Sequence, residues 1–255
     1  MTAEPVAVLD LTDEELAVLA TTEGAVVFPH LSELPQQAQR VAKDTAYRSL
    51  IAHGLLEAPS PSQVQQAERE ALGTADGQVA YPVRMAEELA RMLTLRAQAT
   101  MVVCCARTTA LGQEYRYAHV VAGVVLLETV TSTGLHRMSL LAEQDLLAHV
   151  RTWVLHPEAT PGSGEDVIQL VGAGEDPTPP DELLDRLGAA LLRADLVVRT
   201  ADDEGGADLL GVFSGPAGTW SCRTAAGAAG PVVIRPSSPE GVLTELQAAL
   251  EAVAA

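Results

Sequence analysis

Apolar residues recur along this chain in two patterns, at three- or four-residue intervals in some segments and in short dense runs in others. The first pattern is typical of amphipathic helices and the second of strands. Helices are predicted over 13–22, 35–53, 62–72, 83–95, 142–154, 180–194 and 238–252. Strands are predicted over 25–28, 100–106, 115–123, 124–131, 136–140, 195–200, 209–214, 218–224 and 231–235, and 167–171 fits a short strand or a helical turn. The mixture predicts an α+β fold.

The clearest start of a helix lies at Thr12. Thr12 and Glu15 have the spacing of a capping box, in which the threonine hydroxyl and the glutamate carboxylate each bind a backbone amide of the other residue. Leu11 and Leu16 flank this pair at the positions of a hydrophobic staple. Capping therefore accounts for the acidic run at 13–15, which does not have to be a cation site.

Three pairs of segments in the two parts of the chain are alike. The segments 100–106, 119–124 and 144–150 are matched by 195–200, 211–216 and 240–246, at offsets of 95, 92 and 96 residues. A nearly constant offset indicates one supersecondary unit copied once, here β-β-β-α. We therefore expect residues 1–255 to form a single domain with pseudo-repeats of roughly 1–155 and 156–255. A duplicated unit of this kind makes a pseudo-symmetric platform, which needs no catalytic constellation.

The charge of the chain excludes several classes of partner. The formal net charge is −18 and the basic residues are scattered along the sequence, so binding to nucleic acid or to an anionic membrane is not expected. The N-terminus lacks the features of a signal peptide, and the longest apolar stretch, 118–127, is half of a membrane span. Three cysteines, two of them adjacent, fit small buried apolar residues in a reducing compartment. A cytoplasmic protein is predicted.

The sequence contains no strong catalytic or metal-binding motif. The six histidines do not have metal-ligand spacing and are interpreted as structural; they are His30, His53, His119, His136, His149 and His156. The acidic run 202–204 lies beside two glycines and fits a solvated turn, and 213–215 lacks the spacing of a hydrolase nucleophile elbow. We therefore expect no catalytic residues, no cofactor and no metal, and we do not expect an enzyme.

Short motifs at both ends of the chain resemble the EspG family, the cytosolic specificity chaperones of actinobacterial type VII (ESX) secretion. The opening motif is 11–19 (LTDEELAVL), followed by a predicted strand and then 46–56 (AYRSLIAHGLL). The closing motif is 218–222 (GTWSC), followed by 232–236 (VVIRP) and an amphipathic helix. The resemblance implies a quasi-two-fold α+β fold, with a central, mainly antiparallel twisted sheet flanked by helical bundles.

The resemblance also implies a partner, a helical protein that is a type VII secretion substrate. By analogy with the family, a loop after the second strand and the C-terminal helix would hold it. The loop corresponds here to 107–114, with Arg107, Thr108, Leu111 and Glu114, and it is short for the family. The helix corresponds to 242–250. Its apolar positions are Val242, Leu246 and Leu250.

Two other functions remain open at the level of sequence. One is a small-molecule sensor or enzyme with a pocket between the two halves, which would need convergent polar groups. The other is a winged-helix regulator, because the segment 48–56 has the look of a recognition helix running into a wing. The net charge of −18 opposes DNA binding by such a helix. The oligomeric state and the partner's identity do not follow from the sequence.

Overall fold

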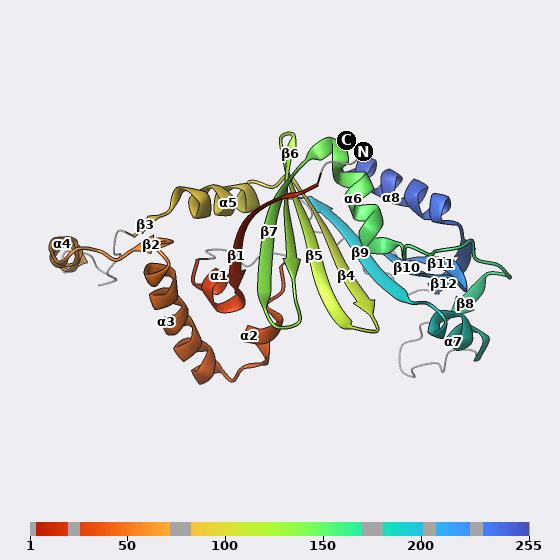
Figure 1. The fold of residues 1–255 in the computed structure, drawn as a ribbon, viewed down its shortest axis with the longest axis horizontal. Coiled ribbons are helices and arrows are strands. Elements are labelled where there is room, and N and C mark those ends of the chain that lie inside the picture. Colours follow the sequence, from red (N-terminus) through yellow and green to blue (C-terminus); the bar gives the residue numbers. More distant parts are fainter. Residues whose placement is uncertain are drawn as a thin grey trace.

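The computed structural model describes residues 4–19, 26–71, 83–169, 181–200, 208–224 and 232–254, and it consists of one large sheet with helices on both faces (Figure 1). The sheet strands are β1 (Val6–Thr12), β4 (Met101–Thr109), β5 (Gly112–Val121), β6 (Val124–Val130), β7 (Leu135–Ala142), β8 (Val167–Gln169), β9 (Leu192–Thr200), β10 (Leu209–Gly215), β11 (Gly218–Thr224) and β12 (Val232–Ser237). A separate two-stranded ribbon joins β2 (Leu56–Glu57) to β3 (Arg84–Met85).

The helices are α1 (Asp13–Leu19), α2 (Pro29–Glu33), α3 (Gln36–Ala52), α4 (Pro61–Ala71), α5 (Glu87–Ala97), α6 (Leu146–Val154), α7 (Asp181–Gly188) and α8 (Pro239–Ala254), and a 3₁₀ turn, Glu143–Asp145, precedes α6. Helices α3 and α4 lie at one end of the molecule, and α7 lies at the other end beside β8 (Figure 1). The α+β prediction is confirmed.

The sheet has ten strands in the order β1-β7-β6-β5-β4-β9-β10-β11-β12-β8 within the described residues. Every pairing in it is antiparallel, as predicted. Its centre is the pair β4 and β9, which runs from Met101 opposite Thr200 to Thr109 opposite Leu192. This pair joins two four-stranded meanders. One meander runs from β4 to β7 and is followed by α6, and the other runs from β9 to β12 and is followed by α8. The duplication of one unit stays a prediction.

The two faces of the sheet are covered by different helices. Side chains that alternate along a strand point to opposite faces, and the adjacent cysteines illustrate this. Cys105 is buried in the main core under α6 and α8, whereas Cys104 packs on the other face beside Val26 and Tyr117. That second face carries α1, α3 and α5 over β1, β6 and β7, and it carries α7 over β10 to β12. The two adjacent cysteines therefore lie on opposite faces of β4.

Several predicted boundaries were wrong. No strand was predicted at Val6–Thr12, where β1 forms one edge of the sheet, and residues 26–28 are not a strand. The helix predicted over 180–194 ends at Gly188, because Leu192 already begins β9 and pairs with Thr109. The loop expected over 107–114 is a tight hairpin, with strand pairing from Arg107 opposite Glu114 to Thr109 opposite Gly112. Parts of other predictions lie outside the described residues: 20–22, 25, 72, 170–171, 180, 201–207 (with the acidic run 202–204) and 231.

Candidate functional site

Four of the predicted binding residues lie on the hairpin that joins β4 to β5. Strand pairing continues to Thr109 opposite Gly112, so only Ala110 and Leu111 form the turn. Gly112 has φ +118°, a conformation that side-chain-bearing residues rarely adopt, which fixes the chain reversal at this point. The Leu111 side chain is 100% exposed. The hairpin therefore presents an apolar side chain to solvent at its tip.

Arg107 and Glu114 face each other across this hairpin and form an ion pair. The distance from Arg107 Nη1 to Glu114 Oε1 is 2.8 Å, and Arg116 Nη2 lies 2.7 Å from the same oxygen. These side chains share a sheet face with Cys105, the face that α6 and α8 cover. Each is mostly buried, so the cluster stiffens the hairpin on the face opposite to the groove described next.

A groove of about 600 Å³ opens beside the hairpin on the other face of the sheet. Thr108, Thr109 and Ala110 form its wall on the hairpin side. The remaining lining comes from the end of α7, from β9 and from β10 to β12: Leu187, Ala190, Leu191, Arg193, Phe213, Cys222, Val232 and Ile234. Apart from Arg193 and the two threonines, this lining is apolar, and Leu191 is 49% exposed. Thr108 thus lies in the wall of an apolar groove, and the exposed Leu111 follows Ala110, the last hairpin residue that lines it.

The predicted binding residues on the C-terminal helix lie elsewhere. Val242 and Leu246 are fully buried in the main core, on the face opposite to the groove, and Leu250 packs partly buried against the same core. In this structure the three side chains hold α8 on the sheet and do not join the hairpin residues. A binding role for them stays a prediction.

A second cluster, which sequence analysis missed, is a buried chain of charged side chains on the N-terminal half of the sheet. Asp13 Oδ1 lies 2.7 Å from His136 Nε2, and His136 Nδ1 lies 2.6 Å from Glu128 Oε1. Glu128 Oε2 is 3.0 Å from His119 Nε2 and 3.3 Å from Arg96 Nε. Asp13, Glu128 and His136 have no exposed surface. We call these five residues the charge chain.

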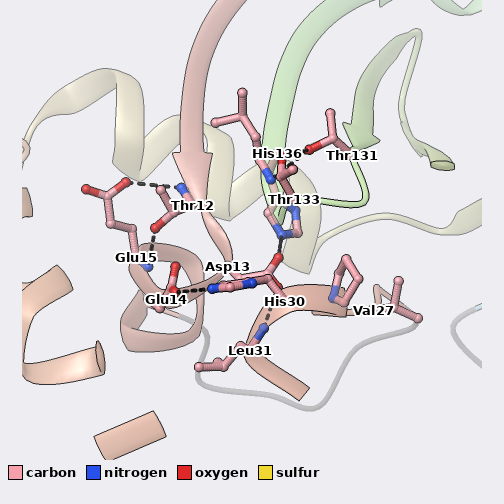
Figure 2. A network of polar contacts seen from close by, with 12 residues as sticks. Thr12, Asp13, Glu14, Glu15, Val27, His30, Leu31, Thr131, Thr133 and His136 are labelled. Atoms are coloured by element: carbon pink, nitrogen blue, oxygen red, sulfur yellow. Dashed lines mark hydrogen bonds and ion pairs between the residues drawn. The ribbon is translucent and has the colours of Figure 1, made fainter. Parts of the chain in front are cut away.

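The charge chain connects separate elements of the fold. Asp13 Oδ2 also accepts a hydrogen bond of 2.9 Å from the backbone amide of Leu31, which attaches α2 to the start of α1. Figure 2 shows Asp13 between Leu31 and His136, with the Thr12–Glu15 capping box beside it. The capping prediction is confirmed for Glu15, but Asp13 has a different role. Asp13, Glu128 and His136 are fully buried and Arg96 keeps only a small exposed part, so the charge chain ties these elements of the fold together and is not open to a ligand.

The electrostatics of the charge chain follow from these contacts. Burial alone would lower the pKa of His136, but its hydrogen bonds to Asp13 and Glu128 outweigh burial and raise the pKa above its ordinary value. Burial would raise the pKa of Glu128, but hydrogen bonds from His119 and His136 and the charge of Arg96 lower it well below its ordinary range. Among the described residues, no group of three or more histidine, cysteine or acidic side chains is arranged to hold a metal ion.

No family model matches the sequence. No curated protein matches it either. The fold is similar to that of the type VII secretion system chaperone EspG5 of Mycobacterium tuberculosis, solved in complex with a PE25–PPE41 dimer. The TM-score is 0.45 at 10% sequence identity, over 80% of this chain and 93% of that chain. This is a distant likeness in the arrangement of elements.

In the described part of the chain, no helix has the length and apolar character needed to span a bilayer.

Proposed function

We propose that this protein is a binding protein of the EspG type, which holds an apolar helical segment of a type VII secretion substrate and performs no chemistry. Two sources support the proposal: the EspG-like motifs at 11–19, 46–56, 218–222 and 232–236, and the surface around the hairpin. We further propose that the two meanders descend from one duplicated unit, and that the protein works in the cytoplasm. The partner would be a helical secreted protein, of the general kind that PE25–PPE41 represents for EspG5.

The observation that carries the proposal is the fully exposed Leu111 beside an apolar groove. A monomeric protein gains nothing in stability from an apolar side chain held in water at a hairpin tip. Burying this side chain against a partner would contribute about 1.5–3 kcal/mol to binding. An amphipathic helix laid into the groove would cover Leu191 and contact Leu111 at the same time.

The alternative is a small-molecule site in the same groove, whose volume of about 600 Å³ is of a suitable size. Specific small-molecule sites have several polar groups that converge on one point. Arg193 and two threonines are the strongest polar groups among the lining residues. This composition favours an apolar protein segment over a metabolite.

Affinity capture with matched variants tests the proposal. The full chain, its Leu111→Asp variant and its Val41→Asp variant would be immobilised and exposed to an actinobacterial lysate. Val41 is 61% exposed on α3, a helix that lies toward the end of the molecule away from β4 (Figure 1), so it controls for the added charge. We expect the wild type and Val41→Asp to retain one helical secreted protein that Leu111→Asp loses. Retention of the same proteins by all three chains would contradict the proposal, as would a metabolite-induced thermal shift that Leu111→Asp leaves unchanged.

A further inference from the structure

The groove contains one charged side chain, Arg193, among the residues that the structure places around it. The guanidinium lies 5.6 Å from the centre of the Phe213 ring, which is itself almost fully buried. Arg193 Nη2 is 2.9 Å from Asp195 Oδ2, two residues along the same face of β9. Even so, the Arg193 side chain is 56% exposed. The groove therefore has a cation at its wall that is held in place but still open to a partner.

The strand register explains why the guanidinium has a defined position. Arg193 lies directly opposite Phe213 on β10 and opposite Thr108 on β4. An arginine above an aromatic face is stabilised by cation–π attraction and loses less conformational freedom when it binds. Thr108 adds an exposed hydroxyl in the next cross-strand position. Arg193 and Thr108 thus belong, with Phe213, to one row across three adjacent strands.

The sign of this charge is unusual for the chain. With a formal net charge of −18, the protein as a whole repels acidic partners. A single arginine cannot reverse that long-range field, but it acts at contact distance. Its planar group carries five N–H donors in a fork that fits a carboxylate with two parallel bonds, and Asp195 is recorded at one of its nitrogens. The exposed part of the group remains available for a second carboxylate.

We propose that Arg193 determines the specificity of the groove by binding an aspartate or glutamate of the partner beside the partner's apolar stripe. The inference rests on the proposed function, and it defines the partner segment as an amphipathic helix. Side chains three or four positions apart lie on one helix face, so the acid sits within one turn of the apolar residues that enter the groove. A neutral or basic residue at that position covers the exposed N–H groups of the guanidinium without offering them an acceptor, which weakens binding.

A display selection tests the inference without a known partner. A phage library of helical hairpins, randomised along one face, would be selected against the immobilised full chain and against its Arg193→Glu and Arg223→Glu variants. Arg223 on β11 is a matched control. Its side chain is 55% exposed and paired with Asp208, with 3.4 Å between Nε and Oδ2. It lies directly opposite Leu210 on β10, whose side chain belongs to the main core. The side chain of Arg223 is therefore on the face of the sheet opposite to the groove.

We expect clones from the wild type and from Arg223→Glu to combine leucine or phenylalanine with one recurring aspartate or glutamate. Clones from Arg193→Glu should carry lysine or arginine at that position. Purified wild-type clones should bind Arg193→Ala about tenfold more weakly, the effect of losing one charged hydrogen-bonding partner. Circular dichroism and thermal unfolding would verify that each variant is folded.

The outcomes separate the two proposals. Two results would overturn the role of Arg193 and leave the binding groove standing. One is a set of clones that do not bind Leu191→Glu and show no preference for an acidic residue. The other is a set of clones that do not bind Leu191→Glu but bind Arg193→Ala as tightly as the wild type. A selection that yields no clone dependent on Leu111 or Leu191 would contradict the proposed function itself, and the inference about Arg193 with it.

Discussion

The ring of His136 on β7 and the carboxylate of Glu128 on β6 lie 2.6 Å apart, Nδ1 to Oε1, without exposed surface on either. Because the other ring nitrogen lies 2.7 Å from Asp13, both nitrogens face oxygens of acidic side chains, which accept hydrogen bonds when they are ionised. The ring satisfies both only when both nitrogens carry protons. His136 is thus an imidazolium, and together with Arg96 it balances the two buried carboxylates.

This arrangement predicts how stability depends on pH. The pKa of His136 is raised in the folded state, so its contribution is complete below the ordinary pKa of about 6.5 and is lost as the pH rises through the higher folded value. The pKa of Glu128 is lowered, so its contribution is complete above the ordinary carboxyl pKa and is lost only in strong acid. We expect the free energy of unfolding to fall on the alkaline side, by about 1.4 kcal/mol for each unit of the histidine shift.

Urea unfolding between pH 5 and 10, on the wild type and His136→Gln, measures this effect. The variant should be less stable by roughly 3–5 kcal/mol at neutral pH, since it removes the ring that faces the buried carboxylates of Asp13 and Glu128, while Arg96 remains beside Glu128. Burial raises the pKa of Cys104 to about 11 and that of Cys105 to about 12, so both proteins lose stability when the pH passes the ordinary thiol value. Because the cysteines affect both proteins equally, the difference in the free energy of unfolding between wild type and His136→Gln at each pH reports the contribution of His136 alone. A difference that is independent of pH would show that His136 is not charged.

Much of the fold could be predicted from local patterns, because most strands are neighbours in sequence and meet in hairpins. The edge strand β1 was missed, since its partner β7 lies far along the chain and the segment Val6–Thr12 leads directly into a capping box. The charge chain was missed for the same reason. Asp13 and His136 are separated by 123 positions, so no spacing in the sequence relates them.

The candidate site was predicted in part. Leu111 lies in a short polar stretch between two apolar runs, which is the local signal of an exposed turn, and the structure exposes it fully. The groove beside it could not be predicted, because it combines side chains from β4, β9 to β12 and the end of α7. Val242 and Leu246 have the apolar spacing of a helix face, but spacing alone does not tell a face that binds a partner from a face that packs on the sheet.

The capping box at Thr12 predicts a measurable loss on substitution. Glu15 N lies 3.2 Å from Thr12 Oγ1, and Thr12 N lies 3.1 Å from Glu15 Oε2. Thr12→Ala removes the first bond and should reduce the free energy of unfolding by about 1 kcal/mol, whereas Thr12→Ser keeps the hydroxyl and should cost little. Urea unfolding of the three proteins checks this. Equal losses for alanine and serine would mean that the threonine methyl group, and not the cap, is responsible.

Two glycines with the same backbone conformation form a further matched pair. Gly54 has φ +71° and Gly134 has φ +72°, but their surroundings differ. A Cβ at Gly54 meets nothing within 4 Å, whereas one at Gly134 would lie 2.8 Å from Asp13 Cγ and from His30 Cβ. Gly54→Ala should therefore cost about 1–2 kcal/mol from the left-handed conformation alone.

Gly134→Ala carries the same conformational cost and also displaces Asp13 from the charge chain. We expect it to be clearly less stable than Gly54→Ala in urea unfolding, and to show a weaker dependence on pH between pH 6 and 9, because the contact of Asp13 with His136 is disturbed. Losses of equal size in the two variants would show that the loop at Gly134 moves aside and that Asp13 keeps its position.

The different environments of Leu246 and Leu111 predict opposite results for the same substitution. Leu246 lies on the inner face of α8 and is fully buried, so Leu246→Ala leaves a cavity and should cost about 2–5 kcal/mol of stability. Leu111 is fully exposed, so Leu111→Ala should leave the thermal unfolding temperature unchanged and weaken only the binding of the displayed helices. Thermal unfolding and binding would be measured on both variants. If Leu246→Ala reduced binding while the protein stayed as stable as the wild type, α8 would be part of the binding surface, as the EspG resemblance implies; a large loss of stability would place Leu246 among the core residues that support it.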